Sequence, residues 1–142
     1  MTFEPGALAE LYRLTDGYPY FIRAYGKVAW DAAPESPIRA VDVRAGAPEA
    51  EDELAVGFFG SRYERATPAE RDYLRAMADL GAGTDDAPVA TADVASAVGR
   101  RPQSLSPARD ALIKKGLVYA AERGAVAFTV PHFGVFVRAQ SG

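Results

Sequence analysis

Hydrophobic side chains recur at helical spacing between residues 67 and 80, and the signals that begin and end a helix flank them. Thr67 can cap this helix, Pro68 suits its first position, and Glu70 stands where it completes a capping box. Gly81 would end the helix. The buried stripe predicted for it contains Tyr73, Leu74, Met77 and Leu80.

Two shorter helices are predicted after it. The first would begin at Thr91, which can cap it, and end at Gly99. The second would open near Ser104 or Ser106 and end at Lys114-Lys115-Gly116, where positive charge suits a helix C-terminus. The inward sides expected of the two helices contain Val94, Ala95, Val98, Leu105, Ala108 and Leu112.

Two β-strands are predicted next, over residues 117–121 and 126–130. Arg123-Gly124 lies between them, and glycine can take the positive φ that a tight hairpin needs. A short closing helix is expected from Phe133, Phe136 and Val137. Three helices followed by a two-stranded ribbon is the order of a winged helix-turn-helix, so the predicted fold class is mostly α with a β wing.

The first part of the chain is also helical in period. One short helix is expected around residues 7–12. Thr15-Asp16-Gly17-Tyr18 would break it, and Pro19 would begin a second helix that runs to about Ala33. Such an arrangement predicts a small helical bundle ahead of the winged helix.

A third, weaker helix is expected to start after Pro48. Its inward side would contain Ala50, Leu54, Phe58 and Phe59. Its first turn, where negative charge favours the helix dipole, would contain Glu49, Glu51, Asp52 and Glu53. The predicted division of the chain is therefore a bundle with its connecting helix over residues 1–63 and a winged helix over residues 64–142.

Composition narrows the classes of protein that the chain can belong to. Of its 142 residues 49% are hydrophobic and 25% charged, which is typical of a globular protein with a real core. The absence of cysteine excludes disulfides and thiolate metal sites, and no apolar run approaches the length of a membrane span, so we expect a cytoplasmic protein. Residues 1–61 hold 5 basic and 10 acidic side chains, whereas residues 62–142 hold 11 and 9. The part that reads as a DNA-docking fold is thus the more basic part, by a small margin.

Two segments together resemble a known arrangement. Residues 15–22, with the sequence Thr-Asp-Gly-Tyr-Pro-Tyr-Phe-Ile, are followed by Tyr25-Gly26 and Trp30, and they resemble the helical lid of AAA+ and signal-transduction (STAND) P-loop ATPases. Residues 65–131 resemble the winged helix that follows that lid, from Arg-Ala-Thr-Pro-Ala-Glu-Arg at the entry to Phe-Thr-Val-Pro at the exit. Lid plus winged helix is also the C-terminal arrangement of origin-recognition-type initiator ATPases. The resemblance covers nearly the whole chain.

The catalytic parts of that family are missing from this sequence. A phosphate-binding loop needs G-x-x-x-x-G-K-[ST], but Gly26-Lys27 is followed by Val28, and Phe21 stands where the first glycine belongs. Paired acids after an apolar strand, which would hold Mg²⁺, are missing as well. We therefore expect a non-catalytic chain with no cofactor of its own. The resemblance implies the C-terminal region of a longer ATPase, whose missing N-terminal core would bind ATP or ADP with Mg²⁺ and would be its first partner.

In the resembled family the G-x-P of the lid lies against the nucleotide. That role carries over to Gly17 and Pro19, and also to Tyr18 between them. Arg23, one turn later, would be placed to sense phosphate. The alternatives are that the glycine and proline only turn the chain between two helices, and that the arginine is an ordinary solvated side chain.

The candidate DNA-binding side chains gather on the last helix before the strands and on the wing. They are Arg101, Gln103, Ser104, Ser106, Arg109 and Arg123, with Arg100 placed to face the phosphate backbone. Asp110 and Glu122 lie among them and weaken the positive charge. Two other readings stay open: a winged helix that docks protein or holds an ATPase at rest, and a freestanding transcriptional regulator that dimerises through its N-terminal helices.

The remaining candidates have simpler interpretations. His132 is the only histidine and is expected in a turn, and Thr84 with Asp85-Asp86 offers too few oxygens for calcium. The rings of Tyr18, Tyr20, Phe21, Tyr25 and Trp30 are expected mainly in the core, with Tyr18 and Tyr20 the most exposed. Because some would face the missing ATPase core, we also expect weak self-association.

Overall fold

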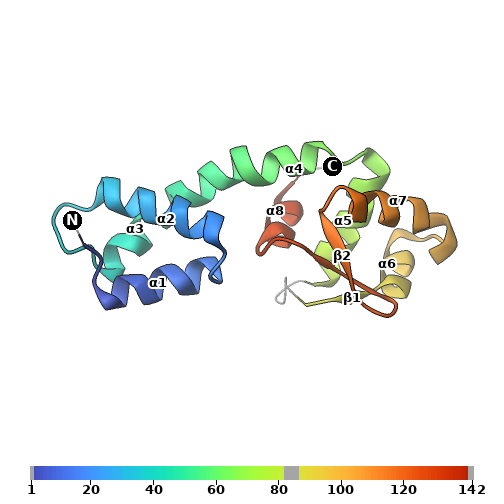
Figure 1. The fold of residues 1–142 in the computed structure, drawn as a ribbon. Helices are drawn as coiled ribbons and strands as arrows, with labels where there is room; N and C mark the ends of the chain where they lie inside the picture. The colour runs from blue at the N-terminus through green and yellow to red at the C-terminus, as the bar shows by residue number, and fades with distance from the viewer. Residues whose placement is uncertain (1, 82–86, 141–142) are drawn as a thin grey trace. The chain divides into compact units, whose positions relative to one another are not determined.

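A computed structural model describes residues 2–81 and 87–140 of the chain. Two compact units divide it, residues 1–60 and residues 61–142. The chain is mostly helical with a small antiparallel sheet, and the predicted fold class, a helical bundle followed by a winged helix-turn-helix, is confirmed (Figure 1). None of the helices in the described residues is long and apolar enough to cross a membrane.

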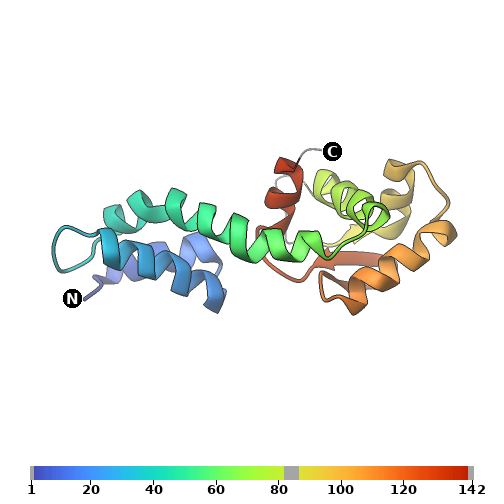
Figure 2. The same ribbon diagram turned by 90° about the horizontal axis from the view of Figure 1, so that it is seen from above.

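Three helices make up most of the first unit: α1 (Pro5–Thr15), α2 (Pro19–Ala32) and α3 (Ala40–Glu53). They pack against one another side by side (Figure 2). Both α1 and α2 begin with proline in the first turn, where its missing N–H costs nothing. Asp16 and Gly17 form the tight turn between them, both with positive φ. The core of the bundle contains Ala7, Leu11, Phe21, Tyr25, Val28, Ala29, Val43 and Ala50.

The prediction that the third helix starts after Pro48 is wrong, because Pro48 lies inside α3. Proline costs about 3 kcal/mol in a helix interior, and for that reason the sequence favoured a helix start. Residues ahead of Pro48, among them Val43 and Ala47, are buried, and the backbone N–H of Arg39 donates to Asp42 Oδ2 at 2.9 Å at the true start. The free energy gained from burying these residues and from the hydrogen bond at the helix start outweighs the cost of the proline. The acidic cluster of residues 49–53 therefore lies in the last turns of α3, not in a first turn.

The helical run continues past α3 through an unusual segment. A π-helical stretch, η1 (Leu54–Phe59), leads into α4 (Gly60–Glu64), and the Gly60 N–H bonds to the carbonyl of Ala55. The residues predicted to face inward here, Ala50, Leu54, Phe58 and Phe59, are all buried. The boundary between the two units falls within this run, at residues 60 and 61.

The second unit opens with α5 (Pro68–Leu80), and its predicted start is confirmed. Thr67 Oγ1 accepts from the Glu70 N–H, and Glu70 Oε1 accepts from the Thr67 N–H, both at 3.3 Å. The buried stripe contains Tyr73, Leu74 and Met77 as predicted, but Leu80 is 43% exposed. Since the stripe continues from Met77 to the buried Gly81 at four-residue spacing, Leu80 falls at its edge.

The helix-turn-helix consists of α6 (Thr91–Val98) and α7 (Pro102–Lys114); α6 begins at Thr91 as predicted, but the predicted cap of α6 and the predicted start of α7 need correction. Thr91 does not cap α6, because its N–H and its hydroxyl both donate to the carbonyl of Gly124 in the wing turn, at 2.8 and 3.2 Å. Helix α7 begins at Pro102, not at Ser104 or Ser106. Proline is best placed in a first turn, and here the earlier of two prolines takes that position.

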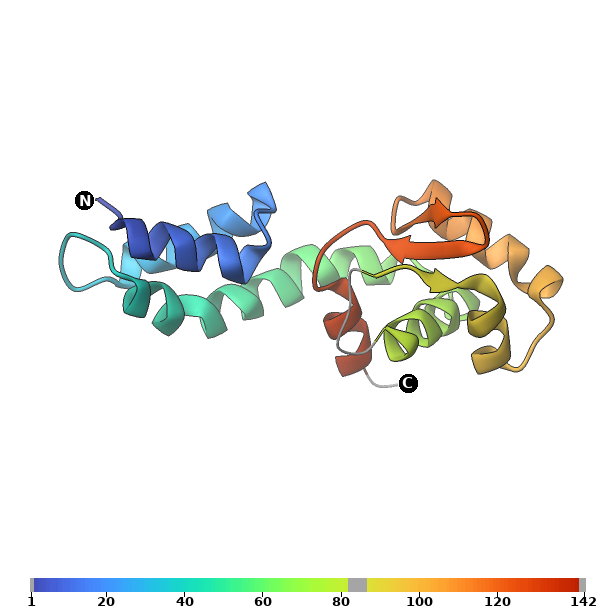
Figure 3. The same cartoon turned by 90° about the horizontal axis from the view of Figure 1, so that it is seen from below.

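The sheet has three strands in the order β1-β3-β2, all antiparallel (Figure 3). Strands β2 (Val118–Glu122) and β3 (Ala125–Phe128) form the predicted wing, and Gly124 takes the expected positive φ of 75° in its turn. The short β1 (Val89–Ala90), which the sequence did not predict, pairs with β3 through Val89 and Val126. Two residues are too few to show a strand period.

The expected closing helix is α8 (Phe133–Ala139), and it packs on α5 (Figure 2). Phe133 and Val137 are buried in this contact. Two arginines fix the helix ends: Arg75 Nη1 donates to the carbonyl of Gln140 at 2.7 Å, and Arg138 Nη1 donates to that of Ala78 at 2.8 Å.

Gly46 marks the close approach of α3 to α2. A Cβ there would lie 2.9 Å from Val28 Cγ1, and Val28 is itself buried. We expect Gly46→Ala to lower the free energy of unfolding by about 1–3 kcal/mol, as overpacking does, despite the better helix propensity of alanine. Gly57→Ala is the matched control, because a Cβ there meets nothing within 4 Å. It should be neutral or stabilising by up to about 1 kcal/mol. Urea unfolding followed by circular dichroism measures both, and equal stability of the two variants would contradict the packing argument.

Candidate functional site

Several arginines of the second unit are held inside it. Arg65 Nη2 donates to the carbonyl of Lys115 at 2.8 Å. Arg71 Nε donates to the carbonyl of Tyr63 at 3.2 Å, and its guanidinium lies 4.7 Å from the centre of the Tyr63 ring. Arg75 and Arg138 bond to the carbonyls near α8 described above. These four side chains hold loops and helix ends together.

Arg100, Arg101 and Arg123 are placed differently. All three are exposed, and within the described part of the chain no hydrogen bond or ion pair ties their side chains to another residue. Arg100 and Arg101 directly precede α7, and Arg123 lies in the turn between β2 and β3. The second helix of a helix-turn-helix and its flanks are the parts that meet DNA in that class of protein.

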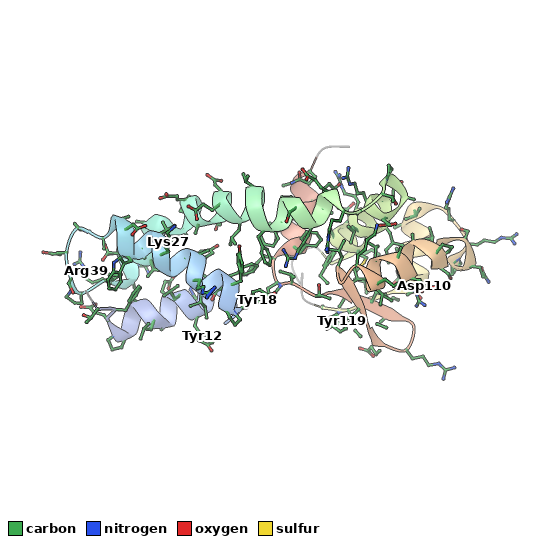
Figure 4. All side chains as sticks on the ribbon, turned by 45° about the horizontal axis from the view of Figure 1, so that its top comes forward. Tyr12, Tyr18, Lys27, Arg39, Asp110 and Tyr119 are labelled. Atoms are coloured by element: carbon green, nitrogen blue, oxygen red, sulfur yellow. The ribbon has the colours of Figure 1, made fainter. Side chains whose placement is uncertain are left out.

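The exposed face of α7 brings together three further predicted side chains, Gln103, Ser104 and Ser106. The Ser104 hydroxyl donates to the carbonyl of Arg101 at 2.9 Å, so its oxygen stays free to accept a hydrogen bond. No acid lies in the first turn of α7, which leaves the positive end of its dipole uncompensated. Asp110, labelled on α7 in Figure 4, is the acid of this helix.

Arg109 is not on that exposed face. Its side chain is 36% exposed, and its Nη2 lies 3.4 Å from Asp110 Oδ1. The Nε atom is buried and has no hydrogen-bond partner among the described residues. Because Arg109 stands four residues after the buried Leu105, it falls at the edge of the inward stripe of α7. The sequence analysis placed Arg109 nearer solvent. Its spacing of four residues from Leu105 is the signal that could have predicted its partial burial.

The position of α7 depends on an ion pair that the sequence did not predict. Lys115 Nζ donates to Glu70 Oε1 at 2.6 Å and to the carbonyl of Arg65 at 2.8 Å. Glu70 is only 7% exposed, and its oxygens already serve the cap of α5. Burial raises the pKa of Glu70, but the hydrogen bonds from Lys115 and Thr67 outweigh it and hold this pKa below its ordinary value.

The residues implied in nucleotide contact lie at one end of the first unit, near Tyr12 and Tyr18 in Figure 4. Gly17 has a φ of 73°, and a Cβ there would come within 2.7 Å of the Tyr12 ring. The Tyr18 ring is half-buried, with its centroid 4.8 Å from that of Phe21. A surface pocket beside it is lined by Tyr18, Pro19, Tyr20 and Arg23.

The other aromatic side chains divide between the core and the surface. Phe21 and Tyr25 are buried as expected, and burial together with the nearby Glu51 raises the pKa of Tyr25 to about 12. Tyr20 is 51% exposed and packs one face on Phe58, with ring centroids 4.5 Å apart. Trp30 was expected in the core but is 44% exposed; it lies near the end of α2, where its ring contacts that of Phe3.

His132 and the acidic loop were the minor candidates. His132 has a positive φ of 67° and caps the start of α8, in keeping with the turn predicted for it. Thr84 and Asp85-Asp86 lie outside the described residues. Among the residues that are described, no cluster of acids and histidines could hold a metal ion.

The comparison with known protein families matches most of this second unit. Residues 56–137 fit the family model described as "Domain of unknown function (DUF8462)". The chain belongs to this family. The family region begins within η1 and ends within α8, so it contains every candidate DNA-binding residue and none of the residues implied in nucleotide contact. No curated protein and no solved structure matches the chain.

The depressed pKa of Glu70 predicts a dependence of stability on pH. A carboxyl whose pKa is lowered by folding stabilises the fold above its unfolded pKa of about 4.3, and this contribution is lost as the pH falls through the folded value. We expect Glu70→Gln to cost about 1–3 kcal/mol at neutral pH, because glutamine keeps the cap but leaves Lys115 without its charge partner. The difference from the native chain should shrink below pH 4.

Urea unfolding at neutral and acidic pH measures this effect. Glu64→Gln is the matched control, since Glu64 is exposed on α4 and no ion pair joins it to another described residue. A loss for Glu70→Gln that stays the same at both pH values would contradict the assigned role of the carboxylate.

Proposed function

We propose that this chain is a non-catalytic docking region whose winged helix binds duplex DNA through the start of α7 and the β2–β3 turn. The observation that carries the proposal is the placement of the unengaged arginines. Arg65, Arg71, Arg75 and Arg138 are held by carbonyl groups, whereas Arg100, Arg101 and Arg123 extend from the two elements that a winged helix offers to a phosphate backbone.

The chemistry at the start of α7 supports phosphate binding. Two arginines precede the positive end of a helix whose first turn holds no acid. Gln103 and Ser104 add a donor and an acceptor on the same exposed face. Base-specific contact would fall to Gln103, which can pair with adenine in the major groove. Asp110 and Glu122 limit the strength of the interaction, so affinity should be modest and strongly dependent on salt.

The wider role that we propose follows from the resemblance to the lid and winged helix of AAA+ and STAND ATPases. In this proposal the parent protein binds ATP or ADP with Mg²⁺ in a separate core, and Gly17, Tyr18 and Pro19 touch the nucleotide. Tyr18 and Tyr20 both pack on Phe58, which belongs to η1. A change at the nucleotide would thereby reach the run of residues 48–63 that leads to the winged helix. This link is the proposed route of coupling.

Binding to a labelled random-sequence duplex across a salt series tests the DNA proposal. Each arginine on a phosphate contributes about 0.9 to the slope of log K against log salt. Replacing Arg100, Arg101 and Arg123 together by glutamine should therefore reduce that slope by about 2 to 3 and weaken binding at low salt.

The matched control removes three exposed cations from the first unit, Arg13, Lys27 and Arg44, also as glutamine. It changes the net charge equally and should leave the slope close to that of the native chain. Equal loss in both triple variants would mean that net charge alone drives binding. No binding at low salt would refute the proposal and favour protein docking.

Protein docking is the second candidate, and an exposed aromatic side chain supports it. Tyr119 on β2 is 46% exposed (labelled in Figure 4), and tyrosine is enriched in protein interfaces. In this candidate Asp110 and Glu122 would be part of the contact. Tyr119→Ala separates the two functions, since it should weaken binding to the ATPase core and leave the salt dependence of DNA binding unchanged.

A further inference from the structure

The π-helical stretch η1 departs from the α-helical hydrogen-bond pattern of α3 before it and α4 after it. The Gly60 N–H bonds to the carbonyl of Ala55, five residues back, where an α-helix would use the carbonyl of Val56. Segments with this pattern are rare in proteins and are frequent at functional sites. Particular contacts of this chain must therefore stabilise the π-helical register.

Burial of two adjacent phenylalanines explains why η1 is π-helical. Leu54 and Phe58 are each 4% exposed and Phe59 is 7% exposed, whereas Val56 is 82% exposed. In an α-helix residues five apart point about 140° away from each other, so Leu54 and Phe59 could not face the same core. Hydrogen bonds to the fifth residue bring such a pair closer into line. The π register thus allows Phe59 to be buried together with Leu54 and Phe58.

An aromatic cluster of the first unit holds the two phenylalanine rings. The Phe21 ring meets both edge-on, with its centroid 5.3 Å from that of Phe58 and 5.5 Å from that of Phe59. Tyr20 and Tyr18 pack on Phe58, with centroids 4.5 and 6.2 Å away. Aromatic pairs of this kind stabilise a fold beyond the area that they bury. An α-helical η1 would turn Phe59 out of the cluster, so these contacts favour the π register.

Gly60 permits the π register. A Cβ there would lie 2.8 Å from the carbonyl oxygen of Ala55, which is the acceptor of the Gly60 N–H. A Cβ atom does not come so close to a backbone oxygen, so any other residue would force this hydrogen bond to change. An α-helix makes no such demand, since alanine is its best-accommodated residue. Gly60 is therefore needed in one register only.

The helical run is held at both ends of the possible register change. Phe58 and Phe59 belong to the aromatic cluster of the first unit. Tyr63, in α4, is held by the second unit, because Arg71 Nε donates to its carbonyl and the Phe136 ring lies 5.8 Å from its ring. Conversion of η1 to an α-helix would change the phase of the run by one residue, or about 100°. The change would therefore turn the second unit about the axis of this run.

We propose that η1 is a two-state switch, π-helical in this structure and α-helical in a second state, and that the rings around Phe58 determine which state is populated. Burial of Phe59 stabilises the first state, and regular hydrogen bonds stabilise the second. Loosening of Tyr18 or Tyr20 shifts the population towards the α state. The switch needs neither DNA nor nucleotide. Only its use in coupling rests on the proposed function, since Tyr18 is also proposed to touch the nucleotide.

NMR couplings across hydrogen bonds measure the register directly in the full chain, labelled with ¹³C and ¹⁵N. In the native chain the Gly60 amide nitrogen should couple to the carbonyl carbon of Ala55. In Gly60→Ala the coupling should move to the carbonyl carbon of Val56, because the new Cβ excludes the π register. Gly57→Ala is the matched control. A Cβ there meets nothing within 4 Å, so this variant should keep the coupling to Ala55.

A second variant tests the aromatic contacts and leaves Gly60 in place. Tyr20 is 51% exposed, so Tyr20→Ala removes its ring from Phe58 at little risk to folding. It should raise the ratio of α to π register about two- to tenfold. Relaxation dispersion at the amides of residues 56–60 measures this population, since such changes occur in microseconds to milliseconds. Trp30→Ala removes a 44% exposed ring near the other end of α2 and should leave the ratio unchanged.

Three results would overturn the proposal. Coupling to Ala55 that persists in Gly60→Ala would mean that the Cβ does not exclude the π register. The absence of exchange at residues 56–60 in both the native chain and Tyr20→Ala would leave η1 with a single register. An equal effect of Trp30→Ala would mean that general destabilisation, and not the ring on Phe58, shifts the population. If Gly60→Ala does not fold, the dispersion measurements decide. None of these measurements involves DNA, so the DNA proposal and the switch can each fail alone.

Discussion

The buried carboxylate of Glu70 joins the start of α5 to the end of α7 in the second unit. Glu70 serves two helices at once, since it completes the cap of α5 and accepts from Lys115 at the end of α7, 45 residues later in the chain. A charge so little exposed is stable only when it is paired and hydrogen-bonded. Lys115 extends the connection to the carbonyl of Arg65. The C-terminal end of α7 is thereby fixed to α5, and the opposite end, with Arg100 and Arg101, is left to solvent.

The sequence predicted those features that depend on residues close together in the chain. The cap of α5, the turn at Gly124 and the proline at the start of α2 each need only a few neighbouring side chains, and all were correct. Where two local signals competed, the prediction failed. Pro48 reads as a helix start, but buried residues on its N-terminal side extend α3 through it. In α7 the first proline took the position that the sequence had given to a later serine.

The features that the sequence missed depend on residues distant in the chain. The two-residue β1 exists because β3 offers it a partner, and Thr91 bonds to Gly124 for the same reason. Predicting the ion pair of Glu70 and Lys115 would have required knowing that the end of α7 lies beside the start of α5. Six candidate DNA-binding residues could be named from spacing alone, but spacing could not separate the exposed Arg101 from the half-buried Arg109, because both are arginines flanking or within one helix.

The arginines of the second unit divide into those that bond to carbonyl groups of the fold and those that are exposed to solvent. An arginine that donates to a carbonyl group inside the fold is held in one position, and fewer of its five N–H donors are free for a ligand. By this criterion Arg71, Arg75 and Arg138 are structural. Arg101 and Arg123 have no such bond and face solvent, where a polyanion can reach them. Arg109 belongs to neither group, since its buried Nε lacks an acceptor among the described residues, whereas its Nη2 lies 3.4 Å from Asp110 Oδ1.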